Sequence, residues 1–342
     1  MHRPLRLTLD RAALQHNWRW LRDRSGTACG AAIKADGYGV GARQTRDALL
    51  EAGCRDFFVS NWAEAAELGA VPEGASLAVL HGVGPQEVEA ALASTARPVL
   101  NSVEQVERWM AIAPARPCDV MVDTGMNRLG LRPEETAVLA GVSIDTLHSH
   151  LACADEDHPL SAQQLERFSD AATAIAARRY SLANSAGICL GADYSFDLVR
   201  PGLALYGGIP RREAQGHIRQ VARIQAAIVQ RRTIRAGESC GYGATFVAEA
   251  DTEAAILNIG YADGYLRGFS SRGSAFAGEF ALPVLGRVSM DLIAIGCDAA
   301  PDLEEGDWVE LDYNLPEAAA QSGLSQYELL TTLGDRFERR WR

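Results

Sequence analysis

The chain has 342 residues, of which 47% are hydrophobic and 23% charged, and its formal net charge is -11. This length exceeds what one hydrophobic core usually covers, so two domains are expected. The acidic balance argues against nucleic acid or an anionic membrane as the main partner. No apolar stretch reaches the ~18 residues of a membrane span and no signal-peptide core follows the start, so we expect a cytoplasmic protein.

The seven cysteines are far apart in the sequence, with no CxxC pair and an odd total. This pattern predicts neither a disulfide framework nor a zinc ribbon, and no metal site is expected. Most of the cysteines are interpreted as small buried hydrophobic residues. Cys240, close to Tyr242, is the one candidate for a reactive thiol.

The basic residues are unusually uniform: of 33 lysines and arginines, only Lys34 is a lysine. A coding bias toward arginine explains the general pattern. Arginine replaces lysine in most surface roles, but its guanidinium stays protonated and forms no imine with an aldehyde. The surviving lysine therefore indicates a Schiff-base role, with accidental survival as the alternative.

From residue 28 to about residue 207, short apolar runs alternate with longer helix-like stretches, as in repeated βα units. The predicted strands are 28–33, 56–60, 76–80, 98–100, 119–123, 144–150, 179–183 and 203–207, and predicted helices include 61–68, 85–92, 103–110 and 161–177. Eight strands in about 200 residues predict an α/β fold of the (β/α)8 TIM-type barrel, with its chemistry at the C-terminal strand ends.

Near residue 218 the sequence pattern changes to short strand-like runs separated by Gly and Pro, which predicts a C-terminal β-rich domain. The predicted strands are 220–235, 254–259, 281–284, 290–296 and 308–311. The stretch 5–9 alternates like a strand and is assigned to the same domain. We therefore predict a barrel at residues 10–218 and a β-rich domain at residues 219–342 plus residues 1–9.

The segment AAIKADGYGVG (31–41) combines the single lysine with a glycine-rich turn. A strand delivers Lys34 near its C-terminal end, hence at the predicted barrel mouth. The glycines permit positive φ and close approach of backbone amides, and Tyr38 offers a hydroxyl to a phosphate. The alternative is a buried lysine followed by an ordinary turn.

This segment resembles the lysine motif of the alanine racemases, which depend on pyridoxal 5'-phosphate (PLP). Eight further motifs occur in the same order as in that family. They are VDTGMNRLG (122–130), HSHLACAD (148–155), LANSAG (182–187), VRPGLALYG (199–207), GYGATF (241–246), IGYADGY (259–265), GRVSMD (286–291) and QYELL (326–330). The resemblance covers nearly the whole chain and implies a homodimer in which the β-rich domain completes the partner's active site.

The resemblance implies that Lys34 holds PLP as a Schiff base and acts as one base, while Tyr242 of the partner subunit acts as the second. Two bases on opposite faces of the substrate Cα are what inversion of a carbanion requires. Arg200 would face the pyridine nitrogen of PLP and, because it stays protonated, leave the ring unprotonated. For Tyr242 and Arg200 alone, an interface tyrosine and a salt-bridged arginine are the structural alternatives.

The same resemblance implies a phosphate cradle and a substrate-carboxylate site. The cradle comprises Tyr38, Ser185, Tyr327 and the amides of Gly202 and Leu203. Arg128 and the amide of Met290 would hold the carboxylate. His150 would hydrogen-bond Arg200 or orient nearby groups, Tyr261 would line the entrance, and Asp291 would support its loop.

One position departs from the family pattern. Many members have a carbamylated lysine seven residues before the arginine equivalent to Arg128, and here that position is Met121. A methionine is not carbamylated and accepts no strong hydrogen bond. Another group must therefore orient Arg128, either a bound anion such as chloride or a neighbouring side chain.

The expected function is racemisation of L- and D-alanine, with a small amino acid as substrate. The near alternative is a serine or broad-specificity racemase. Such an enzyme would turn over serine or lysine with an efficiency comparable to that for alanine. A non-catalytic PLP-binding protein is disfavoured by the β-rich domain that bears Tyr242. A decarboxylase of this architecture would carry histidine-serine-glycine and cysteine motifs that this sequence lacks. The metabolic direction, D-alanine supply for peptidoglycan or catabolism, is left open.

Overall fold

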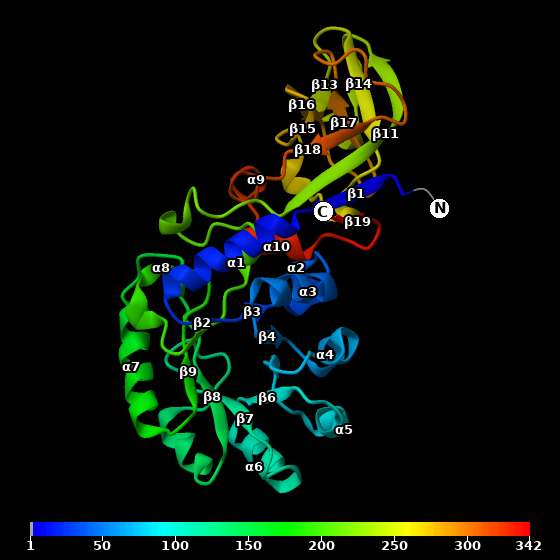
Figure 1. The fold of residues 1–342 in the computed structure, drawn as a ribbon. Coiled ribbons are helices and arrows are strands. Elements are labelled where there is room, and N and C mark those ends of the chain that lie inside the picture. Colours follow the sequence, from blue (N-terminus) through cyan, green and yellow to red (C-terminus); the bar gives the residue numbers. More distant parts are fainter. Residues whose placement is uncertain (1–2) are drawn as a thin grey trace. The chain divides into compact units, whose positions relative to one another are not determined.

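The computed structural model describes residues 3–342, and its contacts divide the chain into two units (Figure 1). One unit comprises residues 14–219 and the other residues 3–13 with 220–342. The unit boundaries in the structure follow residues 13 and 219. The predicted domain boundaries follow residues 9 and 218, which is four residues and one residue earlier. Residues 1 and 2, which we assigned to the β-rich domain, lie outside the described residues.

The core of the first unit is a seven-stranded parallel sheet whose strands follow one another in chain order. Its strands are β3 (Ala31–Ala32), β4 (Asp56–Val59), β5 (Ser76–Val79), β6 (Arg97–Leu100), β7 (Cys118–Met121), β8 (Ile144–His148) and β9 (Arg179–Ser181). Apolar side chains of successive strands meet inside it, including Phe58, Ala78, Val99 and Met121. Such continuously buried strands are typical of a parallel sheet covered by helices.

A second parallel pair closes the sheet into a barrel. The strand β2 (Ala28–Cys29) precedes β3 and pairs with β10 (Leu198–Val199). The backbone hydrogen bonds around β10 are Gly30 N to Val199 O, Ala32 N to Pro201 O, Asp197 N to Tyr180 O and Arg200 N to Ala183 O, at 2.9 to 3.0 Å. They connect β10 to the first strand on one side and to β9 on the other, so the predicted barrel class is confirmed.

The position predicted for the eighth strand, 203–207, is wrong. Residues Leu203–Tyr206 form a 3₁₀ helix that ends at Gly207 with φ 101°, and the eighth strand is β10, a few residues earlier. All four residues of this helix are buried. A short buried apolar run has the same hydrophobicity in a strand and in a helical turn, so periodicity alone did not separate the two.

Helices cover the outside of the barrel strands (Figure 1). The α-helices are α1 (Arg11–Ser25), α3 (Ala42–Ala52), α4 (Trp62–Leu68), α5 (Val88–Ala93), α6 (Val103–Ile112), α7 (Leu160–Ala174) and α8 (Gly187–Leu190), and the element labelled α2 (Lys34–Tyr38) is a turn with left-handed backbone angles after its first residue. Further 3₁₀ helices are Pro85–Glu87, Pro133–Leu139, Ala192–Tyr194 and Arg212–Ala214. The N-cap side chains Asn61 and Ser102 accept from the backbone amides of Glu64 and Gln105, so α6 begins at the predicted residue and α4 begins one residue later than predicted.

The second unit is built on an eight-stranded sheet with the order β14-β17-β16-β15-β18-β11-β1-β19. These strands are β1 (Leu5–Leu9), β11 (Ala222–Ile234), β14 (Thr252–Leu257), β15 (Ser274–Ala277), β16 (Phe280–Leu285), β17 (Ile293–Gly296), β18 (Trp308–Leu311) and β19 (Glu338–Trp341). A bulge between Ile228 and Gln230 divides β11, whose second half pairs with β14 and so joins the two ends of a six-strand ring. Bulges of this kind bend a long strand between two neighbours.

The remaining elements of this unit carry the loops and turns that contain its predicted site residues. They are the hairpin β12 (Ser239–Cys240) and β13 (Phe246–Val247), the helices α9 (Leu315–Ser322) and α10 (Gln326–Thr331), and the 3₁₀ helices Tyr242–Ala244, Tyr261–Asp263 and Arg267–Phe269. The strand predicted at 290–296 begins only at Ile293. Ser289 Oγ accepts from Leu292 N at 3.1 Å, which makes residues 289–292 a turn and places Met290 in a loop.

Candidate active site

Lys34 lies two residues after the end of β3, at the C-terminal end of the barrel strands, where barrel chemistry is found. The four residues after it, Ala35 to Tyr38, all have left-handed backbone angles, with φ between 50° and 62°. Three of them are not glycine, and such a run is costly unless it is held by its surroundings. Glu64 Oε1 accepts from Ala35 N at 2.9 Å and Asp36 Oδ1 accepts from Ala42 N at 2.8 Å, which fixes the turn at both ends.

The Lys34 amine is half-buried, and its environment disfavours the protonated form. Burial lowers its pKa below the ordinary value, and the positive charge of Arg128 lowers it further, while Glu64 opposes both. A lysine with a lowered pKa is more often present as the neutral amine. The neutral amine is the form that attacks a carbonyl and that accepts a proton.

Three of the predicted cradle residues meet in this unit. The Tyr38 ring stacks on Tyr206 at a centroid distance of 4.7 Å. The Tyr38 hydroxyl lies so close to Gly202 that a Cβ there would approach it to 2.2 Å. The buried Ser185 Oγ accepts from Gly202 N at 3.0 Å and from Ala204 N at 3.2 Å. These contacts organise the start of the 3₁₀ helix that begins at Leu203.

The hydrogen bonds of Ser185 determine what its hydroxyl can still offer to a ligand in this cradle. A serine hydroxyl has two lone pairs and one proton, and both lone pairs are used by the two amides. Its proton is therefore the part that can serve an external acceptor. Gly202, whose amide donates to Ser185, contributes mainly the space that Tyr38 occupies.

Arg200 follows β10 and is buried, at 7% exposure. Its guanidinium donates from Nη1 to Ser181 O at 2.9 Å and to Ser181 Oγ, and from Nη2 to Ser149 O at 2.6 Å. Burial lowers its pKa to about 10, with Asp119 acting in the opposite direction. At neutral pH the group is therefore still a cation that donates hydrogen bonds.

His150 lies among three cationic side chains at the same end of the barrel. Burial lowers its pKa to about 3, and the charges of Arg200, Arg128 and Lys34 all lower it further. The ring is therefore neutral in solution near pH 7. In the described part of the chain, the hydrogen bonds of Arg200 go to Ser181 and Ser149 and none goes to His150, so Arg200 acts on His150 through its charge.

The loop that carries Arg128 is held without a carbamylated lysine. Asp123 Oδ1 accepts from the amides of Gly125, Met126 and Asn127 at 2.8 to 3.1 Å. Met121 instead packs into the apolar cluster inside the barrel. The backbone of the loop is thus fixed by Asp123, while the Arg128 side chain is exposed.

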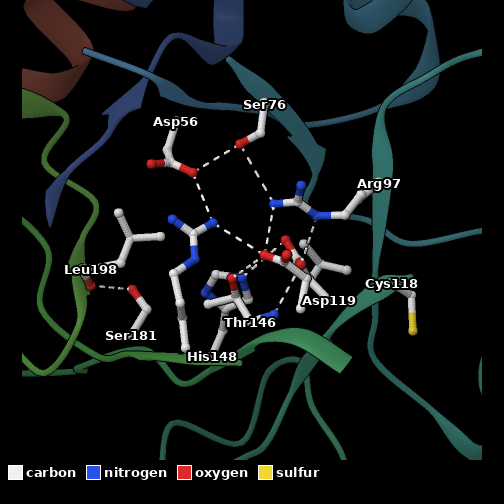
Figure 2. Close-up of polar contacts among 12 residues, drawn as sticks. Asp56, Ser76, Arg97, Cys118, Asp119, Thr146, His148, Ser181 and Leu198 are labelled. Carbon is white, nitrogen blue, oxygen red and sulfur yellow. Dashed lines mark hydrogen bonds and ion pairs between the residues drawn. The ribbon is translucent and has the colours of Figure 1, made fainter. Parts of the chain in front are cut away.

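A network of charged and polar side chains lies mainly at the opposite, N-terminal ends of the barrel strands, and the buried ring of His148, the last residue of β8, joins it through Asp119 (Figure 2). Its contacts are Arg97 Nε to Asp119 Oδ1 (3.0 Å), His148 Nε2 to Asp119 Oδ2 (3.3 Å), Arg179 Nη2 to Asp56 Oδ1 (2.8 Å), Arg179 Nη2 to Asp145 Oδ1 (3.1 Å) and Ser76 Oγ to Asp56 Oδ1 (2.8 Å). Sequence reasoning missed these residues. The available signal was a charged residue at the first or second position of one strand after another, a signal that does not mark His148 at the end of β8.

The other predicted site residues belong to the β-rich unit. Tyr242 opens the loop of the β12–β13 hairpin and is 71% exposed, beside Gly241 and Gly243, whose φ values are 78° and 72°. Tyr327 lies in the first turn of α10, whose capping box pairs Ser325 with the Glu328 amide and Glu328 with the Ser325 amide. The structure thus places Tyr242 in a hairpin loop and Tyr327 in a capped helix of the second unit.

Met290 lies in the turn at 289–292 and is half-exposed. This turn is tied to the segment of Tyr261, because Tyr261 N donates to Ser289 O and Ala262 N to Met290 O, both at 3.0 Å. Tyr261, Met290 and Asp291 are therefore brought together within one unit. Asp291 forms an ion pair with Arg336, a residue that sequence reasoning did not single out.

Two domain models match the chain in succession. The N-terminal domain of alanine racemase matches residues 9–210, and the C-terminal domain of alanine racemase matches residues 221–341. The chain belongs to the alanine racemase family. The resemblance inferred from nine short motifs is thereby confirmed over nearly the full length.

Curated alanine racemases and solved structures from the family agree with this assignment. A catabolic alanine racemase of Agrobacterium fabrum is 41% identical, over 97% of this chain and 91% of the relative, and a biosynthetic one from the same organism is 40% identical, over 99% and 94%. The crystal structure of the Bartonella henselae alanine racemase, with covalently bound pyridoxal phosphate, superposes with a TM-score of 0.92. It is 34% identical and covers 99% of both chains.

In the described residues, no three histidine, cysteine or acidic side chains form a group suited to a metal ion. Helices long and apolar enough to cross a membrane are likewise missing between residues 3 and 342.

Proposed function

We propose that this protein is an alanine racemase that interconverts L- and D-alanine with pyridoxal 5'-phosphate as cofactor. The observation that carries the proposal is the position of Lys34, the single lysine of a family member, half-buried at the catalytic end of the barrel with a lowered pKa. Arginine elsewhere in the chain has no access to the same covalent chemistry. The solved relative from Bartonella henselae binds the same cofactor covalently.

The residues of the barrel unit fit the cofactor. Ser185 has only its proton left to donate, Tyr38 places its hydroxyl beside Gly202, and the 3₁₀ helix at Leu203 presents its N-terminus beside them. Uncharged donors and oriented amides are suited to a phosphate dianion. Tyr327, from the other unit, is proposed to add a further hydroxyl.

The cofactor, when bound, supplies an aldehyde for covalent attachment and a ring that withdraws electrons from the substrate Cα. Lys34 holds it and then moves the Cα proton on one face. Tyr242 of the partner subunit moves the proton on the opposite face, as inversion of configuration requires. Arg200 remains a hydrogen-bond donor at neutral pH and so leaves the ring nitrogen unprotonated, which restrains electron withdrawal and favours racemisation over side reactions.

Substrate recognition is assigned to groups at the edge of this site. Arg128 and the Met290 amide bind the carboxylate, Tyr261 lines the entrance, and Asp291 supports the Met290 loop. The neutral ring of His150 lies under the influence of Lys34, Arg128 and Arg200, and we assign it an orienting role between them. Asp123 fixes the backbone of the loop that carries Arg128.

The assembly we propose is a homodimer with shared active sites, in the cytoplasm. All seven cysteines are free, and most are buried, which is in keeping with a reducing compartment. Burial raises the pKa of Cys240, so a reactive thiolate there is disfavoured. The relatives include biosynthetic and catabolic racemases, and both directions use the same chemistry.

The proposal is tested by the absorbance of the purified protein before and after borohydride and by D-alanine formation from L-alanine with added PLP. We expect an absorbance band at about 420 nm that borohydride abolishes. After this reduction, the mass of the cofactor should be found on the peptide that contains Lys34. Lys34→Arg should lose the band and the activity together. Comparable turnover of serine or lysine would indicate a broad-specificity racemase, and attachment without any racemisation would indicate a cofactor-binding protein instead.

A further inference from the structure

Arg336 connects two loops of the β-rich unit that are far apart in the sequence. It donates to Asp263 from Nε at 2.6 Å and from Nη2 at 2.8 Å, and to Asp291 from Nη1 at 2.7 Å. Two parallel hydrogen bonds to one carboxylate fix the plane of a guanidinium. The third donor is thereby aimed at the carboxylate of Asp291.

Asp263 is the fixed end of this arrangement. Its side chain is 1% exposed, and its Oδ2 also accepts from Gly260 N at 3.0 Å. Its backbone carbonyl accepts from Gly334 N at 3.3 Å, two residues before Arg336. A buried carboxylate with this many donors has a single well-defined position. Asp263 therefore anchors Arg336 to the segment of Tyr261.

Asp291 is the exposed end, because its side chain is 48% exposed and it follows Met290 in the turn at 289–292. The carbonyl of Met290 is held by the Ala262 amide at 3.0 Å. A Cβ at Gly260 would approach Met290 O to 2.3 Å, so the two loops are in close contact. Met290 is thus restrained at its own carbonyl by Ala262 and at the next residue by Arg336.

We propose that Arg336 is a positioning residue for the substrate carboxylate, acting through Asp291 on the Met290 amide with Asp263 as its anchor. This inference rests on the proposed function, which assigns the Met290 amide to the carboxylate. Arg336 is the group that sets the geometry of the loop at 289–292. Arg336 itself contacts two protein carboxylates and is assigned no contact with substrate.

The test uses Asp291→Asn in the holoenzyme, because it removes the charge of the exposed carboxylate and leaves the two hydrogen bonds from Arg336 to the buried Asp263 intact. We expect KM for L-alanine and the calorimetric dissociation constant of propionate, a carboxylate without an amine, to rise together by about tenfold, with kcat changed less than about threefold. The thermal unfolding midpoint should stay at the wild-type value. Asp291→Glu, which retains the carboxylate, should restore most of the affinity.

The matched control is Glu338→Gln, which removes a comparable exposed ion pair, Glu338–Arg340 at 2.8 Å, from the same C-terminal segment. It should leave propionate affinity and KM unchanged. Wild-type affinity for propionate in Asp291→Asn would overturn the inference, as would a fall in kcat accompanied by a lower unfolding midpoint. A wild-type enzyme that does not racemise alanine would refute the proposed function itself, and this outcome is distinguishable because it precedes any variant.

Discussion

The hydroxyl of Tyr38 occupies the space that a side chain at position 202 would need. The backbone of Gly202 does not have a positive φ (φ -128°), so glycine is required there for space rather than for conformation. The approach of 2.2 Å to the Tyr38 hydroxyl and 2.8 Å to its Cζ is far below van der Waals contact. Because glycine has no side chain, it leaves room for the Tyr38 hydroxyl in the proposed phosphate cradle.

Gly202→Ala should therefore displace Tyr38 and weaken PLP binding. We expect the dissociation constant of PLP, measured by fluorescence titration of the apoenzyme, to rise by at least about tenfold because a cradle hydroxyl is moved. Gly296→Ala is the matched control, since a Cβ at Gly296 meets neighbouring atoms only at ordinary distances of 3.5 Å or more. Wild-type PLP affinity in Gly202→Ala would contradict this account of the cradle.

The strands of the barrel have different chemistry at their two ends. Their C-terminal ends lead to Lys34, Arg128, His150 and Arg200, whereas their N-terminal ends carry most of the charged network of Figure 2. His148 joins this network from the end of β8 through its contact with Asp119. In this network burial opposes the ionisation of Asp119, but the hydrogen bond from His148 and the charge of Arg97 outweigh it and hold the pKa of the carboxyl below its ordinary value. Such pairs stabilise a fold only while every member keeps its partner.

His148, the last residue of β8, makes the stability of this network dependent on pH. Burial lowers the pKa of this fully buried ring to about 4, although Asp119 acts against it. Because the folded pKa is below the ordinary value of about 6.5, the unfolded state binds more protons between these values. The contribution is complete above pH 6.5 and is lost as the pH falls toward 4. It should amount to about 2 kcal/mol between pH 7.5 and 5.

His148→Gln keeps a donor for Asp119 but does not titrate, so it should lose less stability over this range than the wild type. The measurement is the free energy of unfolding in urea at pH 7.5 and pH 5. His158→Gln, at an exposed position, controls for the loss of one imidazole. An identical pH dependence in wild type and His148→Gln would show that His148 does not titrate in the unfolding equilibrium.

At the scale of the whole molecule, the proposed catalytic groups belong to two separate units of the chain. Lys34 lies in the unit of residues 14–219, and Tyr242 in the unit that includes residues 220–342. The proposed dimer combines Lys34 of one subunit with Tyr242 of the partner subunit. Each chain then supplies one base to each of two active sites.

Mixing Lys34→Ala with Tyr242→Phe, each inactive alone, should therefore restore activity. Random reassociation makes half of the dimers mixed, and each mixed dimer has one intact site, so recovery of about a quarter of wild-type activity is expected. The measurement is D-alanine formation after the two variants are unfolded together and refolded with PLP. Failure to recover activity, with dimers present by light scattering, would place both bases of a site in the same chain.

Local features were readable from the sequence because they depend on residue type and short spacing. The strands Leu5–Leu9 and Trp308–Leu311 have the predicted bounds, and Lys34 lies at a strand end followed by the predicted positive-φ glycines. The chemistry of a single lysine is likewise a property of the residue itself. The tertiary structure decided which buried apolar run closes the barrel, since a run of four residues has no distinguishing period.

Tertiary structure also decided the partners of the charged residues. Arg336 lies 73 residues from Asp263 and 45 from Asp291, and Arg179 lies 123 from Asp56. Each of these arginines reads as a solvated surface residue in the sequence, because charged side chains are mostly exposed. Only the strand register and the closure of the two sheets bring their guanidinium groups to specific carboxylates. Residue chemistry was thus set by the sequence alone, and ion pairing by the long-range contacts of the fold.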